Sequence, residues 1–419
     1  MINSYLKRNY HILTYVLLYI SLLIGFFLNE NITGGPKVDF EFALKQVKFF
    51  EDSFEYTFFH WHILPDATRI SPLFILILYS AKQILIDLDF VRFFLLHLLL
   101  LTQVAFYYCL KEVYLKTKII LDKRPLILLS CIIFISPAFR ANSIWPESAM
   151  FGLLFFLIGL YFFLKNINNF SNKNIYLNIF FIALASYIRP SYCLFAIYFT
   201  FYYFFTIRNK RLIFNIILTN IILAFPAFYY VFILKIFFIG AGGLDNNYFN
   251  KIPIILSIIS FHLIPLLFYK REIFYKINIL KSKLILFFIL LLSFIFIIGF
   301  DYKISMGGGG ILLHISNFLT DTNYIFFMLI PLFLFCIFKV IKINAYNNIL
   351  IILILLFIAP QYNIFEKYYE PLVFILGLTI LKLDIKKKFF SQPFYLIGSY
   401  SFYAMLYLIN FLNQHFINF

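Results

Sequence analysis

Apolar runs of about 20 residues recur along the whole chain, and they constrain its fold more than any other feature. A helix of this length crosses the hydrocarbon core of a membrane. The composition agrees, because 63% of the residues are hydrophobic and 13% are charged, against about 45–50% and 25% in soluble domains. We therefore predict an all-α, polytopic transmembrane helix bundle of about 13 spans. These spans begin near residues 11, 90, 125, 147, 175, 191, 212, 252, 283, 323, 347, 368 and 393.

Basic clusters between the apolar runs set the orientation. If all of them face the cytoplasm together with Lys7 and Arg8, the spans after residue 111 alternate correctly. This explains the net charge of +16 without a nucleic-acid partner. We predict a multi-pass protein of the bacterial plasma (inner) membrane, surrounded by membrane lipid and with a cytoplasmic N-terminus. The clusters are Lys111–Arg124, Lys165–Lys173, Arg208–Arg211, Lys270–Lys283, Lys339–Lys342 and Lys382–Lys388.

Residues 70–86 conflict with this alternation. Two crossings at 70–86 and 90–110 would place the first basic cluster outside. Lys82, Asp87 and Asp89 weaken the segment as a span, so we predict that it lies in, or re-enters, the outer interface. An ordinary hairpin with an exposed basic loop is the alternative.

Acidic residues are concentrated in the segment that follows the first apolar run. Of 19 acidic residues, seven lie between residues 30 and 69, which we predict to be an exported loop. The apolar positions of "KVDFEFALKQVKFFED" predict an amphipathic juxtamembrane helix on the membrane surface, with Asp39 near its start. Asp39 then either caps this helix or is an ionised carboxylate that takes a proton from a hydroxyl group or orients an incoming nucleophile. The seven are Glu30, Asp39, Glu41, Glu51, Asp52, Glu55 and Asp66.

The same loop ends with "HWHILPDATR". His60, His62 and Asp66 could ligate a cation, although their spacing is not specific and Trp61 is typical of a membrane interface. Arg69 could instead hold a phosphate by a bidentate contact.

Three later outer turns add polar candidates. Arg140 and Glu147 lie in "SPAFRANSIWPESAMFG", a predicted turn region between two prolines. Arg189 is at the tip of a predicted hairpin, and "FEKYYEP" contains Lys367 and Tyr368. Arginines on the outer face run against the tendency of basic residues to lie on the cytoplasmic side, which favours a functional role for them. The alternative is that their side chains anchor helices at the membrane interface.

The order of elements resembles the GT-C superfamily of integral-membrane glycosyltransferases. A first membrane helix is followed by an outer loop that opens with an acidic residue and amphipathic helices, and then by many spans. The segments "SPLFILILYS", "SPAFRANSIWPESAMFGLLFFLIGLYFFL" and "ALASYIRPSYCLFAIYF" also look like that group. The resemblance covers residues 1–210, which would form a catalytic module with outer loop 30–69. Residues 211–419 would be a variable transmembrane half of one domain that extends over 1–419.

The resemblance implies a polyprenyl-phosphate-linked sugar donor and a glycan, lipid or protein acceptor on the exported face. Asp39 matches the catalytic acidic residue of the first outer loop. The sequence Asp39-Phe40-Glu41 replaces the family's acidic pair, so either Asp39 or Glu41 could be the base, and Glu147 matches a second acidic position.

The remaining candidates would then contact the substrates. Candidates for binding the donor phosphate are Arg69, Arg140, Arg189 and Lys367, and candidates for contacting donor or acceptor are His60, His62, Asp66 and Tyr368. No cofactor is expected, with a divalent metal as an open alternative. A transporter or flippase, and a polymerase of lipid-linked glycans, are the rival functions.

Overall fold

The structure is a computed structural model of the whole chain. It describes residues 2–33, 35–64, 71–115, 123–233, 246–267, 279–304, 308–383 and 393–412. Within these ranges the chain is helical and forms no β-strand, as predicted for an all-α protein.

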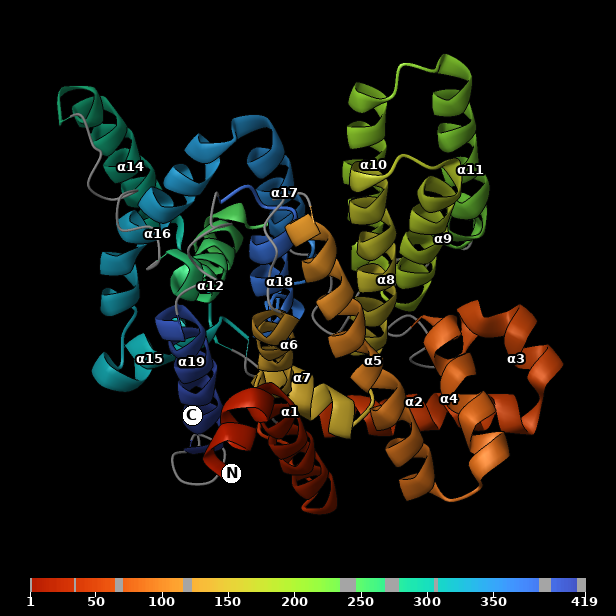
Figure 1. The fold of residues 1–419 in the computed structure, drawn as a ribbon. Helices are drawn as coiled ribbons and strands as arrows, with labels where there is room; N and C mark the ends of the chain where they lie inside the picture. Colours follow the sequence, from red (N-terminus) through yellow and green to blue (C-terminus); the bar gives the residue numbers. More distant parts are fainter. Residues whose placement is uncertain are drawn as a thin grey trace. The chain divides into compact units, whose positions relative to one another are not determined.

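The α-helices within the described ranges are labelled in chain order in Figure 1. They are α1 Ile2–Phe27, α2 Gly35–Asp52, α3 Phe54–His60, α4 Pro72–Leu85, α5 Leu88–Leu115, α6 Lys123–Cys131, α7 Pro137–Ile144, α8 Ser148–Asn168, α9 Asn172–Ile188, α10 Cys193–Thr206, α11 Lys210–Phe228, α12 Tyr248–Leu267, α14 Ile279–Gly299, α15 Ile311–Thr320, α16 Tyr324–Ile343, α17 Ala345–Phe357, α18 Leu372–Thr379 and α19 Pro393–Leu412. Single-turn elements are η1 Trp61–Ile63, η2 Ile132–Phe134, η3 Pro190–Tyr192, the π-helical η4 Tyr229–Ile233 and η6 Glu366–Tyr368.

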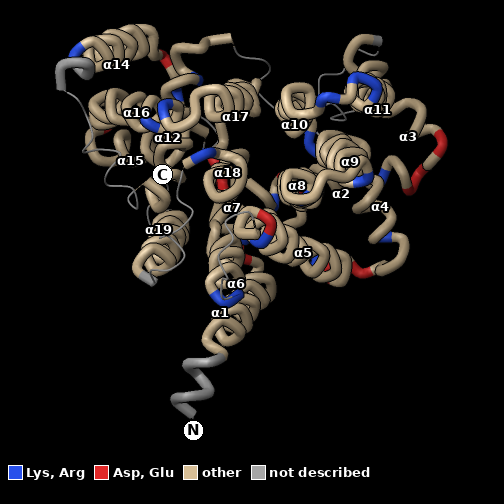
Figure 2. The backbone as a smooth tube through the Cα atoms, turned by 45° about the horizontal axis from the view of Figure 1, so that its top comes forward, with Lys and Arg blue, Asp and Glu red and all other residues tan. Residues whose placement is uncertain are grey.

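Seven helices in the described ranges are long and apolar enough to cross a membrane. The count rises to eight if the bent pair Lys123–Phe134 and Pro137–Ile144, which meet at 65°, forms one span. The helices are largely free of charge along their middles, and Lys, Arg, Asp and Glu gather near helix ends and in connections (Figure 2). These features define a multi-pass membrane protein, while the higher count of about 13 spans stays a prediction.

The chain divides into two compact units. Unit 1 comprises Met1–Gly240 with Tyr403–His415, and unit 2 comprises Ala241–Phe402 with Phe416–Phe419. In unit 1, α8 packs against both α5 and α9, while α1 packs against α6 and α7. In unit 2, α12 is the central helix and packs against α14, α16, α17 and α18.

The predicted helix in the first loop is present as α2. Phe40, Ala43, Val47 and Phe50 recur at helical spacing and are buried, so this face of α2 packs against α4 and α3. Its other face carries exposed charges, and a 2.8 Å ion pair from Glu51 to Lys82 joins α2 to α4. Helix α4 has 14 residues, fewer than the roughly 17 that span a bilayer.

Candidate functional site

The end of α1 turns the chain back on itself. Asn29 has a left-handed backbone with φ 55°, and the Glu30 N–H donates to the Gly25 carbonyl at 2.8 Å. This is the pattern of a Schellman C-cap, in which asparagine tolerates the left-handed position better than most residues. The turn directs Glu30 back toward the helix that it follows.

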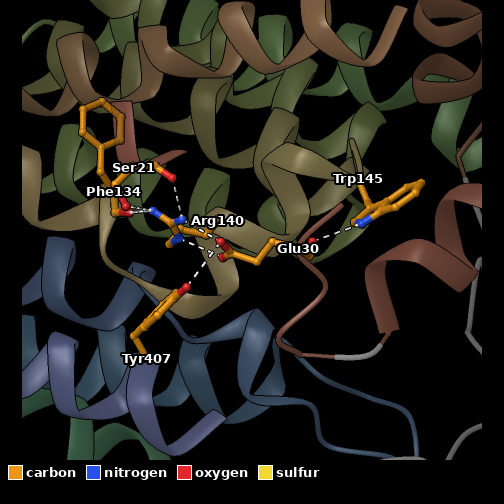
Figure 3. Close-up of polar contacts among 6 residues, drawn as sticks. All are labelled: Ser21, Glu30, Phe134, Arg140, Trp145 and Tyr407. Carbon is orange, nitrogen blue, oxygen red and sulfur yellow. Dashed lines mark hydrogen bonds and ion pairs between the residues drawn. The ribbon is translucent and has the colours of Figure 1, made fainter. Parts of the chain in front are cut away.

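Glu30 forms a bidentate ion pair with Arg140 of α7 (Figure 3). Arg140 donates from Nε to Oε1 at 2.8 Å and from Nη2 to Oε2 at 2.6 Å, and the two side chains are 4% and 10% exposed. Tyr407 of α19 donates a longer hydrogen bond to Oε2 at 3.3 Å, and the Trp145 indole N–H donates to the Glu30 carbonyl at 3.1 Å. Three distant parts of the sequence, around residues 30, 140 and 407, therefore meet at Glu30.

Arg140 uses all five of its N–H donors on protein acceptors. Besides the two bonds to Glu30, Nη1 donates to Ser21 Oγ at 3.1 Å and to the Phe134 carbonyl at 3.4 Å, and Nη2 donates to the Ser21 carbonyl at 3.0 Å. A guanidinium has five donors. The predicted phosphate contact of Arg140 therefore has no donor available in this arrangement.

A sequence-based expectation about Arg140 is also wrong: it lies in α7, not in a turn. Pro137 occupies the first turn of this helix and Ser136 caps it by accepting from the Phe139 N–H. Proline is favoured at that position because its fixed φ suits a helix start. The two prolines of "SPAFRANSIWP" thus begin and follow a helix.

A second buried arginine, Arg92 of α5, lies against the other end of α7. Its guanidinium carbon is 3.7 Å from the centre of the Trp145 ring. Nε donates to the Ile144 carbonyl at 3.3 Å, and Nη1 donates to Asn29 Oδ1 at 3.0 Å and to Asp89 Oδ1 at 2.9 Å. Nη2 is buried and has no hydrogen-bond partner among the residues that the structure describes.

Asp39 lies near the start of α2, between two residues that contact Trp145 of this cluster. It is the fifth residue of α2 and half-buried, so the helix-capping alternative does not hold. Its neighbours both contact Trp145: the Lys37 Nζ is 5.4 Å from the ring centre, and the Phe40 ring is 6.0 Å from it. Glu41 is exposed. The start of α2 is thereby placed beside Trp145.

Glu147 lies at the start of α8, and Arg189, at the end of α9, packs against the same helix. Glu147 is buried at the N-cap of α8, and a Cβ added to Gly152 would lie 2.9 Å from Arg189 Cβ, so Arg189 packs against the next turn. Arg189 follows α9, as the predicted hairpin tip requires. Burial raises the pKa of Tyr192, and the positive charge of Arg189 acts in the opposite direction.

The candidates at the end of the first loop are only partly described. His60 stacks on Tyr56 with ring centres 4.3 Å apart. The side chain of His62, together with Asp66 and Arg69, lies outside the described residues. Trp61 is buried and stacks on Phe50 with ring centres 5.6 Å apart. Among described residues no group of three or more His, Cys, Asp or Glu could hold a metal ion, and a divalent metal stays a prediction.

Lys367 and Tyr368 belong to unit 2, in η6. The Lys367 Nζ lies 5.6 Å from the Phe365 ring centre and 6.0 Å from that of Tyr368. The neighbouring Glu366 accepts from His262 Nε2 at 3.0 Å and from the Ile311 N–H at 3.0 Å. Unit 2 thus has its own carboxylate-centred cluster.

An apolar groove of about 380 Å³ lies between α4 and α5. Its α4 wall comes from one helix face that includes Leu73, Ile77 and Ile84, and its α5 wall includes Phe94 and Leu98. Such a groove suits an apolar chain.

Sequence reasoning missed five residues of the unit 1 cluster: Ser21, Asn29, Arg92, Trp145 and Tyr407. One signal was present, since Arg92 is the single formally charged residue of the apolar run 90–110. A charge within such a run has a functional or structural reason, because burying it unpaired costs several kcal/mol. The other four residues have no such signal.

Comparison with protein-family models, curated proteins and solved structures finds no match to this chain. The fold and the polar cluster define a class, an all-helical multi-pass membrane protein with buried charged residues in its N-terminal unit.

Proposed function

We propose that the protein is a membrane glycosyltransferase that moves a sugar from a polyprenyl-phosphate-linked donor to a glycan, lipid or protein acceptor. The reaction would take place on the exported face of a bacterial inner membrane, with the N-terminus in the cytoplasm. One observation carries the proposal: the start of α2, with Asp39, lies beside Trp145, against which the buried guanidinium of Arg92 stacks.

Asp39 is the proposed base. It would accept the proton of the acceptor hydroxyl, or orient that hydroxyl, while the bond from the sugar to the phosphate breaks. Glu41 is the weaker candidate because it points to the exposed side of α2, away from the buried face. Glu147 is the second acidic candidate, and its burial at the start of α8 supports a role close to Arg189.

Positive charge is needed where the phosphate leaves. Arg69 and Arg189 remain proposed phosphate ligands, and Lys367 of unit 2 stays a separate candidate. Arg140 is better assigned to positioning, because its pair with Glu30 fixes the point where the α1–α2 loop begins. The apolar groove between α4 and α5 would accommodate part of the prenyl chain.

The test is sugar transfer by the full chain reconstituted in lipid vesicles. Synthetic short-chain prenyl phosphates carrying a radiolabelled hexose or pentose would be donors, and a lipid and glycan extract of bacterial membranes would supply acceptors. Wild type should transfer label to the extract. Asp39→Asn should lower the rate by about 100-fold or more, as expected for loss of a general base.

Glu41→Gln is the matched control, since it removes a carboxylate from the same helix. It should keep transfer within a few-fold of wild type. Wild-type rates in Asp39→Asn would remove Asp39 from the mechanism. Passage of the intact donor across the bilayer without transfer would indicate the rival function, a flippase.

A further inference from the structure

Arg92 retains hydrogen-bonding capacity that the described residues do not use. It is 4% exposed, and three of its five donors are bonded to Ile144, Asn29 and Asp89. The buried Nη2 has no partner in the described part of the chain. A buried donor without a partner costs about 1–3 kcal/mol, and native proteins rarely keep one without a reason.

Arg140 shows what a purely structural arginine looks like in the same unit. A bidentate carboxylate and three further oxygens satisfy all five of its donors. Both guanidiniums are buried and both contact α1 or its C-terminal turn. The two arginines therefore differ in unused donors, not in burial.

The counter-ion of Arg92 is weakly held. Asp89 contacts it through one oxygen at 2.9 Å, and the Asp89 side chain is 78% exposed. Water solvates this exposed carboxylate, which weakens its hold on the guanidinium. Trp145 covers the flat face of the guanidinium and leaves hydrogen bonding to its edge.

We propose that Arg92 binds a phosphoryl group through the Nη1–Nη2 edge, with the Asp89 carboxylate swinging into water as the anion takes its place. A planar guanidinium fork matches two phosphoryl oxygens, and a phosphate carries more charge than one carboxylate. The inference rests on the proposed function in one respect, namely that a prenyl lipid would bring the phosphoryl group. Free phosphate offers the same chemistry, and the experiment distinguishes the two sources.

The experiment measures binding, not transfer. Full-length protein in detergent is titrated with geranylgeranyl phosphate, with inorganic phosphate and with geranylgeraniol, which lacks the phosphate. The variants are Arg92→Gln, Arg92→Lys and Asp89→Asn. Lys48→Gln is the control, because it removes one positive charge from an exposed position of α2 in the same unit.

Arg92→Gln should weaken binding of the prenyl phosphate by about 10-fold or more, as loss of charge-assisted hydrogen bonds predicts. The affinity of Arg92→Lys should lie between those of wild type and Arg92→Gln, since lysine keeps the positive charge without the planar fork of donors. Asp89→Asn should strengthen binding several-fold by removing the competing carboxylate, and Lys48→Gln should bind as wild type does. Preference for geranylgeranyl phosphate over inorganic phosphate identifies a lipid-borne group, and equal binding identifies free phosphate.

Wild-type affinity in a folded Arg92→Gln or Arg92→Lys protein would overturn the proposal. If Arg92→Gln does not fold, unchanged affinity in Asp89→Asn would do the same. Asp39→Asn separates this inference from the function, because it should bind the prenyl phosphate normally while failing to transfer sugar. Arg92-dependent binding without any transfer by wild type would overturn the transferase proposal and leave the anion site standing.

Discussion

Each unit holds one glutamate that joins segments far apart in the sequence, but the donors around the two glutamates differ. Glu30 of unit 1 meets a permanent cation, Arg140, at 10% side-chain exposure. Glu366 of unit 2 meets the His262 ring and the Ile311 backbone N–H at 22% exposure. Removal of the negative charge should therefore leave a buried unpaired guanidinium in unit 1, whereas in unit 2 it leaves a backbone N–H and an imidazole ring that an amide can still bond.

Glu30→Gln is the change with the largest expected effect. The amide matches Arg140 on one arm but sets an NH₂ group against the guanidinium on the other, and the positive charge stays buried. Breaking a buried pair by removing one partner costs about 3–5 kcal/mol. We expect the unfolding midpoint of unit 1 to fall by roughly 10 °C.

Local probes make this measurement specific to one unit. Both tryptophans, Trp61 and Trp145, belong to unit 1, so indole emission on heating in detergent reports that unit. Cys336 belongs to unit 2 and is free, so its reaction with a thiol reagent, quantified by mass spectrometry, reports the other. A Glu30→Gln protein whose indole transition matches wild type would contradict the buried-pair interpretation.

Gly25→Ala is the next change in expected size. A Cβ at this position would lie 2.3 Å from Glu30 Oε2 and 2.9 Å from Arg140 Nη2. Alanine normally stabilises a helix interior by about 1 kcal/mol relative to glycine. Here the clash should reverse that sign and destabilise unit 1 by about 1–3 kcal/mol.

Gly398→Ala supplies the control in unit 2, because no heavy atom lies within 4 Å of the added Cβ in α19. It should be neutral or stabilising in the Cys336 assay. Equal effects of the two alanines would show that Gly25 is not required for the approach of the ion pair.

The same two clusters show how far the sequence could lead. The apolar runs predict α1, α5, α8 and α12, because an apolar run of about 20 residues has the length of a membrane-crossing helix. The hydrophobic spacing of residues 40–50 predicts the buried face of α2 in the same way.

The partners of Arg140 could not be predicted from the sequence in this way. Glu30 and Ser21 lie 110 and 119 residues from Arg140 in the sequence, and Tyr407, which donates to Glu30, lies 377 residues from Glu30. Only tertiary packing brings these residues together. The sequence singles out Arg140, but its role depends on which oxygens reach it, and no local pattern encodes that. Asp39 stays a candidate base on the strength of its position beside Trp145.

Glu366→Gln should have a smaller effect than Glu30→Gln. The amide oxygen can still accept from the Ile311 N–H, and its NH₂ group can donate to His262 Nε2 if the ring proton moves to Nδ1. The expected loss is about 1 kcal/mol, seen as a shift of a few degrees in the Cys336 transition. A loss as large as that of Glu30→Gln would mean that unit 2 also depends on a buried charge pair.

Asn29→Gly should have the smallest effect, and Asp321→Gly in unit 2 is its counterpart. Both residues have left-handed backbones after a helix, with φ 55° and 51°. Glycine adopts this conformation at no steric cost, which favours both variants. Asn29 also accepts a 3.0 Å hydrogen bond from Arg92, and glycine would remove it.

These two terms nearly cancel at Asn29, because a lost hydrogen bond to a charged group offsets the gain in backbone freedom. At Asp321 only gains are expected, since removing a negative charge from a helix C-terminus is also favourable. Asp321→Gly should thus raise the unit 2 midpoint, while Asn29→Gly leaves the unit 1 midpoint within about 2 °C of wild type. A rise of equal size in both would show that the Arg92–Asn29 bond contributes nothing, and that Arg92 is held by Trp145 and Asp89 instead.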